Sequence, residues 1–133
     1  MVFMTKTLFV SKEEKVDEIL PLPVKVEMWA MDLCDALMSN YKRRYPNSHN
    51  DMKFVVNVGR KYLKINQVDV RDGVEFGGGV HAFIDKKTGE VYKPASWKSP
   101  AKIVRYDLRI INNRQRLHDP SFTDWAGGYL YLR

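Results

Sequence analysis

Two short apolar stretches separated by a five-residue turn limit the fold of this chain more than any other feature. Residues 80–84 (VHAFI) and 90–93 (EVYK) flank the turn Asp85–Gly89. Both flanks are rich in β-branched and aromatic residues, which favour extended backbone. Thr88-Gly89 closes the turn, as in hairpins in which one turn residue has a left-handed backbone conformation that favours glycine. The sequence therefore predicts an antiparallel β-hairpin near the centre of the chain.

The apolar pattern has a different period upstream of this hairpin. Between residues 24 and 44 apolar residues recur every three or four positions, which predicts a long amphipathic helix. Lys42, Arg43 and Arg44 favour its C-terminal end, and Pro46-Asn47 stops it. The stripe consists of Val26, Ala30, Leu33, Leu37 and Tyr41, widened by Trp29, Ala36, Met28, Met31 and Met38. Because the stripe is wide, we expect this helix to pack on more than one side.

Shorter elements are expected before the helix. Residues 7–10 (TLFV) predict a short strand. Ser11 and Glu14 have the spacing of a capping box, which predicts the start of a short helix that Pro21 and Pro23 end.

Alternating patterns after the helix predict the rest of a sheet. Residues 54–58 and 62–65 predict two strands, or one long strand with a bulge at Gly59. Asp72-Gly73 and the run 77–79 (GGG) predict a flexible connection to the central hairpin.

The C-terminal third gives mixed indications. Ser99-Pro100 predicts the beginning of a helix, whereas residues 104–110 alternate as in a strand. A helical turn that leads into a strand accounts for both patterns. The tail, residues 125–132 (WAGGYLYL), is expected to end in a short strand.

Together these elements predict a single α+β domain over residues 1–133. One long N-terminal helix packs on an antiparallel sheet of about four or five strands, and the length suits one core. No apolar run is long enough to cross a bilayer, and the first residues lack the layout of a secretory signal. We therefore expect a cytoplasmic protein with no membrane partner. The one cysteine, Cys34, excludes an internal disulfide and is expected to be buried.

The sequence contains no arrangement typical of an enzyme. The glycines 77–79 precede a strand, whereas a phosphate-binding loop requires a Lys-Ser/Thr pair that opens a helix. The histidines lack the spacing of metal ligands. Asp85 and Glu90 flank a turn, where such residues usually contact solvent. We expect no catalytic residue, no metal and no cofactor.

Positive charge is concentrated in one stretch of the chain. The whole chain has a net charge of +6. Residues 86–116 hold nine Lys or Arg against Glu90 and Asp107, which leaves the rest of the chain slightly negative. Clustered cations raise the local potential toward phosphates or an acidic protein surface.

Aromatic residues alternate with cations along this basic stretch, a pattern typical of proteins that bind single-stranded nucleic acid. If the part after Pro100 is helical, Lys102, Arg105 and Arg109 lie on one side, and if it is a strand, Arg105 and Arg109 still share a face. Alternatively, Trp97 and Tyr106 are core residues and the cations only their solvated edge. The candidate nucleic-acid-binding residues are His81, Lys93, Trp97, Lys98, Lys102, Arg105 and Arg109.

One long segment resembles a known group of proteins. The run from Gly79 to Lys102, which contains VHAFIDKKTGEVYKPASWKSPAK, resembles a recurring segment in small proteins of tailed bacteriophages, including phages of cyanobacteria. Residues 59–62 (GRKY) and 124–131 (DWAGGYLY) are similar as well. The resemblance covers the chain from about Phe54 onward and carries over no catalytic or binding residues. It implies work in the bacterial cytoplasm during infection, or a place in the virion.

From these observations we expect a non-enzymatic phage accessory protein that binds nucleic acid, preferably single-stranded, through its basic segment. Two alternatives remain open. One is a host-takeover or anti-defence protein that binds an acidic surface of a bacterial protein, and the other is a minor virion component. A continuous exposed stripe of cations beside exposed rings would favour nucleic acid, whereas buried rings and scattered cations would indicate that the cations are only a solvated edge.

Overall fold

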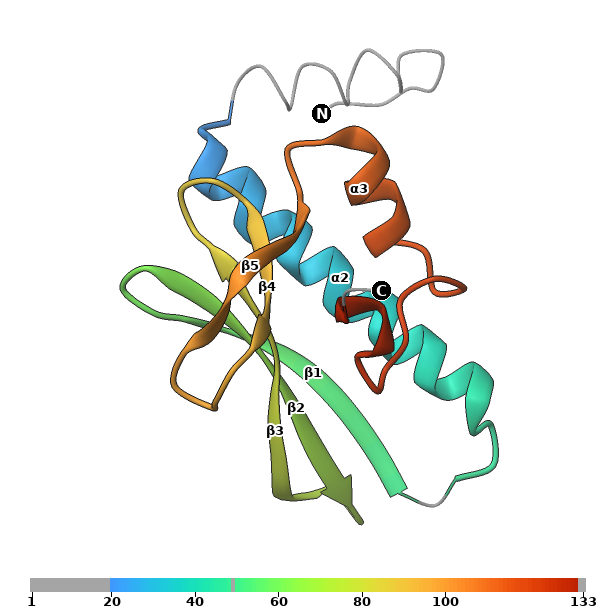
Figure 1. Cartoon of the computed structure of the whole chain (residues 1–133). Coiled ribbons are helices and arrows are strands. Elements are labelled where there is room, and N and C mark those ends of the chain that lie inside the picture. Colours follow the sequence, from blue (N-terminus) through green and yellow to red (C-terminus); the bar gives the residue numbers. More distant parts are fainter. Residues whose placement is uncertain (1–19, 49, 132–133) are drawn as a thin grey trace.

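The computed structural model describes residues 20–48 and 50–131. The strand predicted at 7–10 and the capping box at Ser11 lie outside these residues. Figure 1 shows the elements in chain order. They are α2 (Leu22–Arg44), β1 (Asn50–Val58), β2 (Tyr62–Arg71), β3 (Val74–Asp85), β4 (Glu90–Pro94), β5 (Pro100–Asp107), α3 (Ile111–Leu117) and the 3₁₀ turn Gly128–Leu130.

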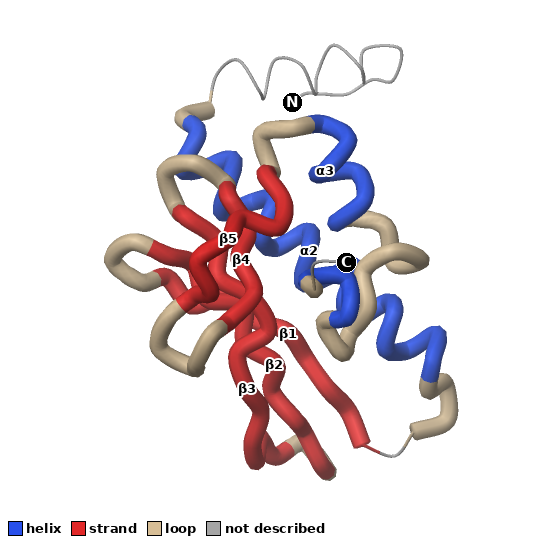
Figure 2. Tube along the Cα trace, viewed as in Figure 1, coloured by secondary structure: helices blue, strands red, loops and turns tan. Residues whose placement is uncertain are grey.

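The five strands form one antiparallel sheet in the order β1-β2-β3-β4-β5, so each strand pairs with its neighbour in the sequence. Both helices lie on the same side of this sheet (Figure 2). The buried side chains of α2 form one core with the residues of the sheet that face it, among them Leu63, Ile65 and Ile84. The predicted α+β class, the long helix and the number of strands are confirmed.

Helix α2 begins two residues earlier than predicted. Pro21 occupies the N-cap in an extended conformation and Pro23 lies in the first turn. Proline is tolerated there because the first amides of a helix have no partner within it. The main stripe is buried as predicted at Val26, Ala30 and Leu33.

The methionines of α2 do not all widen its buried stripe. Met28 and Met31 are exposed, so that part of the prediction is wrong. A second contact surface of α2 faces the C-terminal segment, residues 118–131, and combines polar and aromatic contacts. The ring centroids of Tyr41 and Trp125 lie 5.4 Å apart. The Asn40 side chain donates to the carbonyl of Pro120 (2.7 Å) and accepts from the amide of Trp125 (3.1 Å).

The central hairpin forms as predicted. Gly89 has the positive φ of 79° that its place in the turn requires. The Asp85 carboxylate accepts hydrogen bonds from the amides of Lys87 (2.8 Å) and Thr88 (3.2 Å), which closes the turn. Residues 59–61 form a turn as well, so β1 and β2 are two strands.

The glycines 77–79 lie within β3, and their prediction as a flexible connection is wrong. They pair with β2, where Gly78 lies opposite Val68. Gly78 has a φ of 144°, and a Cβ atom on it would lie 1.8 Å from the carbonyl oxygen of Gln67. These glycines therefore let two backbones approach closely.

The chain after Ser96 differs from the prediction in three respects. Pro100 is the first residue of β5 and begins no helix, because residues 96–99 close a turn with backbone bonds from Ala95 and Ser96 to Ser99. Proline fits the first position of an edge strand, where no amide is needed. Helix α3 was not predicted. Tyr129 and Leu130, expected in a strand, belong to the 3₁₀ turn and are both buried, which an alternating strand does not allow.

Substitution of Gly78 by alanine should destabilise the fold by about 2–4 kcal/mol, because the new Cβ meets backbone at a strained φ. Gly79→Ala is the matched control, since a Cβ at Gly79 meets nothing within 4 Å. It should change the free energy of unfolding by less than about 1 kcal/mol. Urea denaturation followed by circular dichroism measures both, and equal effects would contradict the close approach at Gly78.

Candidate nucleic-acid interface

One face of the sheet, which we call the outer face, points away from α2. Its central row crosses all five strands through directly paired residues. Side chains alternate between the two faces of a strand, and the neighbours of this row, such as Leu63 and Ile84, belong to the core under α2. The row consists of Asn57, Lys64, Phe83, Tyr92 and Val104.

Aromatic rings form the floor of the outer face. Tyr62 contacts Phe83 edge to face, with ring centroids 5.8 Å apart, and contacts Tyr92 in the same way at 6.0 Å. Such arrangements are preferred because the positive edge of one ring meets the negative face of another. Phe83 is buried, whereas Tyr62 and Tyr92 remain half-buried. The rings therefore make a rigid apolar platform.

The loop between β4 and β5 is fastened to this platform by Lys64. The Lys64 ammonium donates to the carbonyl of Trp97 (2.7 Å). The same nitrogen lies 5.0 Å from the centroid of the Trp97 ring and 5.6 Å from that of Phe83. The Trp97 residue is nevertheless 68% exposed. A large ring is thus held in place and presented to solvent.

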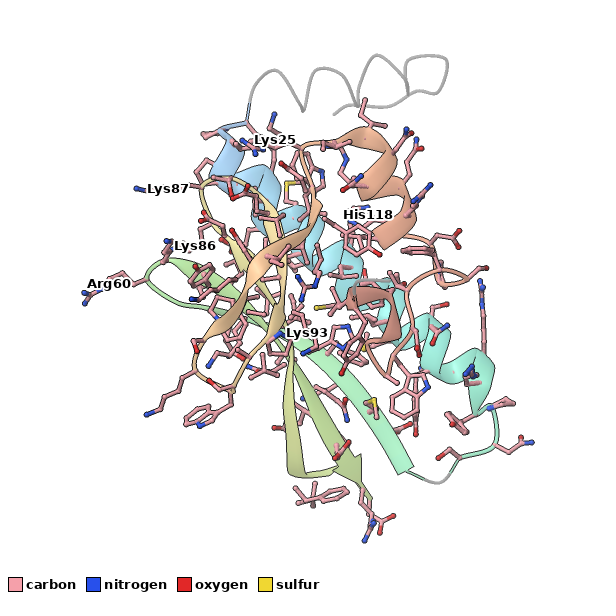
Figure 3. All side chains as sticks on the ribbon, viewed as in Figure 1. Lys25, Arg60, Lys86, Lys87, Lys93 and His118 are labelled. Carbon is pink, nitrogen blue, oxygen red and sulfur yellow. The ribbon has the colours of Figure 1, made fainter. Side chains whose placement is uncertain are left out.

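A cleft of about 560 Å³ lies between this loop and the turn joining β1 to β2. Among the described residues that line it there are four cations and no carboxylate. Lys86 donates to the carbonyl of Gly59 (2.9 Å) and brings a fifth cation to the rim. Figure 3 shows Arg60, Lys86 and Lys87 projecting from the same edge of the molecule. The lining residues are Asn57, Val58, Gly59, Arg60, Lys61, Tyr62, Lys64, Asn66 and Lys98.

Of the residues predicted from the sequence, Lys98 alone is among the described residues that line this cleft. Trp97 lies beside it, with its ring centroid 5.6 Å from the Lys98 ammonium. Lys93 lies over the ring of Tyr131 (4.8 Å), away from the cleft. Lys102 is exposed on the edge strand β5.

Arg105 and Arg109 do not share a face, contrary to the prediction. Val91 pairs with Tyr106 but Tyr92 pairs with Val104, so Arg105 is an extra residue in β5. Its Nε donates to the carbonyl of Leu130 (2.7 Å).

Arg109 follows the end of β5 and forms a salt bridge with Asp107 (2.6 Å). Burial would raise the pKa of Asp107, but the hydrogen bonds from Arg109 lower it. The cations of residues 86–116 are therefore scattered and form no continuous stripe, so this segment by itself does not favour nucleic acid.

His81 lies in the core and not on the outer face. Ile65 pairs with Ala82 but Asn66 pairs with Val80, so His81 is an extra residue in β3 and turns toward the C-terminal segment. Its Nε2 is 2.7 Å from the hydroxyl of Tyr129, and only 7% of the residue is exposed. Burial lowers the pKa of His81 to about 4, although the negative charge of Asp124 acts in the opposite direction and raises it.

Arg60, Lys61 and Lys64 were not predicted to belong to the site, because they lie outside the most basic stretch of the chain. Two features of the sequence point to them. The predicted break at Gly59 places Arg60 and Lys61 in a turn, and the alternation from Tyr62 places Lys64 and Asn66 on one face. The pairing of this turn with a loop more than thirty residues away has no sequence signal.

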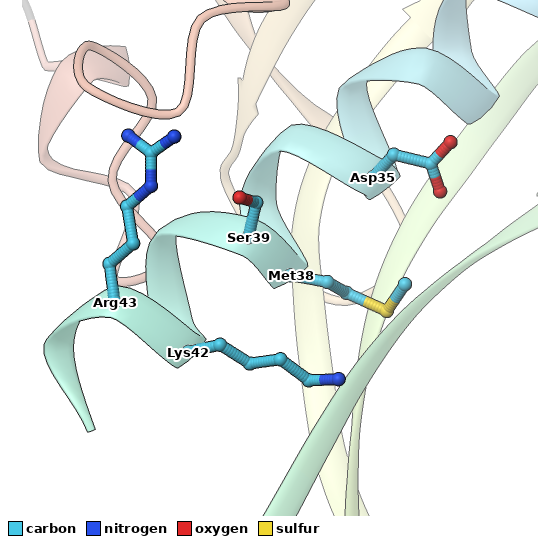
Figure 4. Close-up of a pocket in the computed structure, with 5 residues that line it drawn as sticks. All are labelled: Asp35, Met38, Ser39, Lys42 and Arg43. Carbon is cyan, nitrogen blue, oxygen red and sulfur yellow. The ribbon is translucent and has the colours of Figure 1, made fainter. Parts of the chain in front are cut away.

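A second hollow, of about 450 Å³, lies along α2 and mixes charges of both signs. Asp35 lines it together with Lys42 and Arg43, and Figure 4 shows all its labelled side chains rising from this one helix. A carboxylate between cations makes this hollow less suited to a polyanion than the outer cleft.

Within residues 20–48 and 50–131 no group of three or more His, Cys, Asp or Glu side chains is placed to hold a metal ion. No helix there has the length and apolar character needed to span a membrane. Cys34 is buried as predicted, and burial together with Asp35 raises the pKa of its thiol to about 12.

The fold and the cleft define a class of small α+β protein, in which one long helix backs an antiparallel meander with a basic, aromatic outer face. The chain belongs to DUF7717, a family of unknown function whose model matches residues 7–132. No curated protein and no solved structure matches it.

The buried neutral His81 predicts a loss of stability in mild acid. Its pKa is lower in the folded protein than the usual 6.5 of the unfolded chain, so the unfolded state binds more protons between about pH 6.5 and 4. The free energy of unfolding should fall over this range by up to about 3 kcal/mol. Urea denaturation at several pH values measures this loss.

Two variants separate His81 from other groups that titrate. His81→Gln should remove most of the pH dependence, whereas His118→Gln should retain most of it. His118 is only half-buried, and its Nε2 donates to the carbonyl oxygen of Trp29 (2.9 Å). A pH dependence that persists unchanged in His81→Gln would contradict this assignment.

Proposed function

We propose that this protein binds single-stranded nucleic acid across the outer face. The proposal rests on one observation: a cleft lined by cations lies beside the Trp97 ring, which is held in place and exposed to solvent. Arg60, Lys61, Lys64 and Lys98 contact the phosphates, and bases stack on Trp97. Proteins that bind single strands combine these two kinds of contact.

A single strand suits this surface better than a duplex. Stacking on Trp97 requires a base whose face is accessible, and the bases of a duplex are already stacked on one another. The half-buried rings of Tyr62 and Tyr92 continue the aromatic surface beyond Trp97. The amide side chains of Asn57 and Asn66, which hydrogen-bond each other, add polar groups for base edges.

The setting that we propose is a bacterial cell infected by a tailed phage. This part of the proposal rests on the resemblance of residues 79–102 to proteins of such phages. The segment includes Trp97 and Lys98 together with β4. The part of the chain that carries the resemblance thus also supplies the stacking ring of the proposed interface.

Fluorescence anisotropy with labelled single-stranded DNA, single-stranded RNA and a matched duplex should show binding that weakens as salt rises. Each phosphate contact contributes about −0.7 to the slope of log K against log salt for a single strand, so four contacts predict about −3. The duplex should bind more weakly. Absence of binding at low salt, or binding indifferent to salt, would refute the proposal.

Single substitutions distinguish stacking from charge. Trp97→Ala should weaken binding by about 10- to 100-fold with little change in the salt slope, because it removes about 1–3 kcal/mol of stacking. Arg60→Gln should reduce the slope by about 0.7. Lys42→Gln is the control, since it removes the same charge from α2 on the other side of the sheet and should leave binding unchanged. Equal effects of Arg60→Gln and Lys42→Gln would contradict the cleft.

The expected alternatives give different results in the same assays. If the partner is an acidic bacterial protein, polyglutamate should compete effectively for the basic cleft. Trp97→Ala should then have almost no effect on binding, because carboxylates do not stack on an aromatic ring. A virion role would place the chain in purified phage particles, where mass spectrometry detects it. Either outcome with no oligonucleotide binding would replace the proposal.

A further inference from the structure

A third cavity lies on the α2 side of the sheet, between β5 and the C-terminal segment, and has a volume of about 410 Å³. Four of its six lining residues are aromatic. None of the outer-face residues discussed above lines it. The lining residues are Tyr106, Phe122, Asp124, Gly128, Tyr129 and Tyr131.

Three of the rings stand at different inclinations around the cavity. The centroid of Tyr106 lies 6.1 Å from that of Phe122 with ring planes at 90°, and 6.0 Å from that of Tyr129 at 38°. Phe122 and Tyr129 are 6.2 Å apart at 59°. Tyr131 is exposed and forms the rim.

Hydrogen bonds hold these rings in place. The Tyr106 hydroxyl donates to the backbone carbonyl of Tyr129 (2.6 Å), and the Tyr129 hydroxyl lies 2.7 Å from Nε2 of His81. The walls are therefore fixed before any ligand arrives, which lowers the entropy cost of binding.

Asp124 is the one formally charged side chain among the described residues of the lining. Its oxygens accept from the amides of Ala126 (3.0 Å) and Gly128 (3.3 Å), which orient the carboxylate without neutralising it. Neither salt bridge found in the described part of the chain involves Asp124. The cavity thus combines electron-rich ring faces with one carboxylate that is in neither of these salt bridges.

Cations already occupy ring faces at the edge of this cavity. The Lys93 ammonium lies 4.8 Å from the centroid of Tyr131, and the Arg116 guanidinium lies 5.9 Å from that of Phe122. These contacts show that the rings accept positive charge. The Lys93 ammonium would also compete with a cationic ligand, because it already lies over the ring of Tyr131 at the rim.

We propose that this aromatic pocket binds an alkylated ammonium group, the head of a choline-like molecule or of a methylated lysine. Methyl groups on nitrogen spread the positive charge over an apolar surface that fits against ring faces, and removal from water costs such a group less than it costs a bare ammonium. Asp124 balances the charge. This site is separate from the outer face and does not depend on the proposed function.

Two-dimensional NMR titrations of the ¹⁵N-labelled full chain test the pocket directly. Choline and trimethyl-lysine should each shift the amides of residues 124–131, and the tighter of the two identifies the source of the head group. Lysine without methyl groups and 3,3-dimethyl-1-butanol, the neutral isostere of choline, should bind at least about 10-fold more weakly. No shift with either methylated cation, or equal binding of the neutral isostere, would overturn the proposal.

Variants of the pocket give a second, independent readout. Asp124→Asn should weaken choline binding by about 10-fold, and Tyr131→Leu, at an exposed position, by about 3- to 10-fold. Lys93→Gln should strengthen it because the competing cation is gone. Phe76→Leu, at an exposed ring in β3, is the control and should change nothing.

Whether Lys93→Gln strengthens or weakens binding shows whether the ligand is positively or negatively charged. Weaker binding in this variant, or a response of residues 124–131 to a nucleoside monophosphate in place of choline, would overturn the cationic assignment. Oligonucleotide anisotropy on Tyr131→Leu should match that of the unmodified chain. A failure of nucleic-acid binding in every variant would therefore count against the proposed function and not against this pocket.

Discussion

Two of the extra residues at register shifts in the sheet, His81 and Arg105, hold the C-terminal segment against the core, and the rest of the structure depends on this attachment. His81 in β3 and Arg105 in β5 each interrupt the pairing with the neighbouring strand, and each turns its side chain toward residues 129–130. Helix α2 alone leaves part of the sheet uncovered, and the segment closes it with Tyr129 and Leu130. A β-bulge thus re-aims a side chain that simple alternation would place on the other face.

This arrangement separates the chemistry of the two faces. On the α2 side, buried apolar residues surround neutral polar groups such as His81, and the carboxylate of Asp124 stands at the edge of an aromatic cluster. On the outer face, cations surround exposed rings. The sheet lies between these two surfaces, so the small protein presents a basic surface on one side and an aromatic, acidic one on the other.

The sequence predicted those elements whose pattern is local. The helix followed from the spacing of Val26, Ala30 and Leu33, and the central hairpin from the turn that ends at Gly89, because neighbouring residues decide both. The bulges at His81 and Arg105 depend on register between strands, which one sequence does not reveal. The cleft joins a turn near Arg60 to a loop near Lys98, so the charge count along the chain found only one half of it. Helix α3 has a single buried residue, Leu117, and hence no periodic signal.

The hydrogen bond from Lys64 to the carbonyl of Trp97 gives one ammonium group two tasks. It keeps the loop between β4 and β5 against the platform, and it supplies charge to the cleft. Acetylation of Lys64 would remove both at once, since the neutral amide carries no charge and retains a single N–H in another position. A one-residue modification would therefore loosen the exposed ring and lower the local potential together.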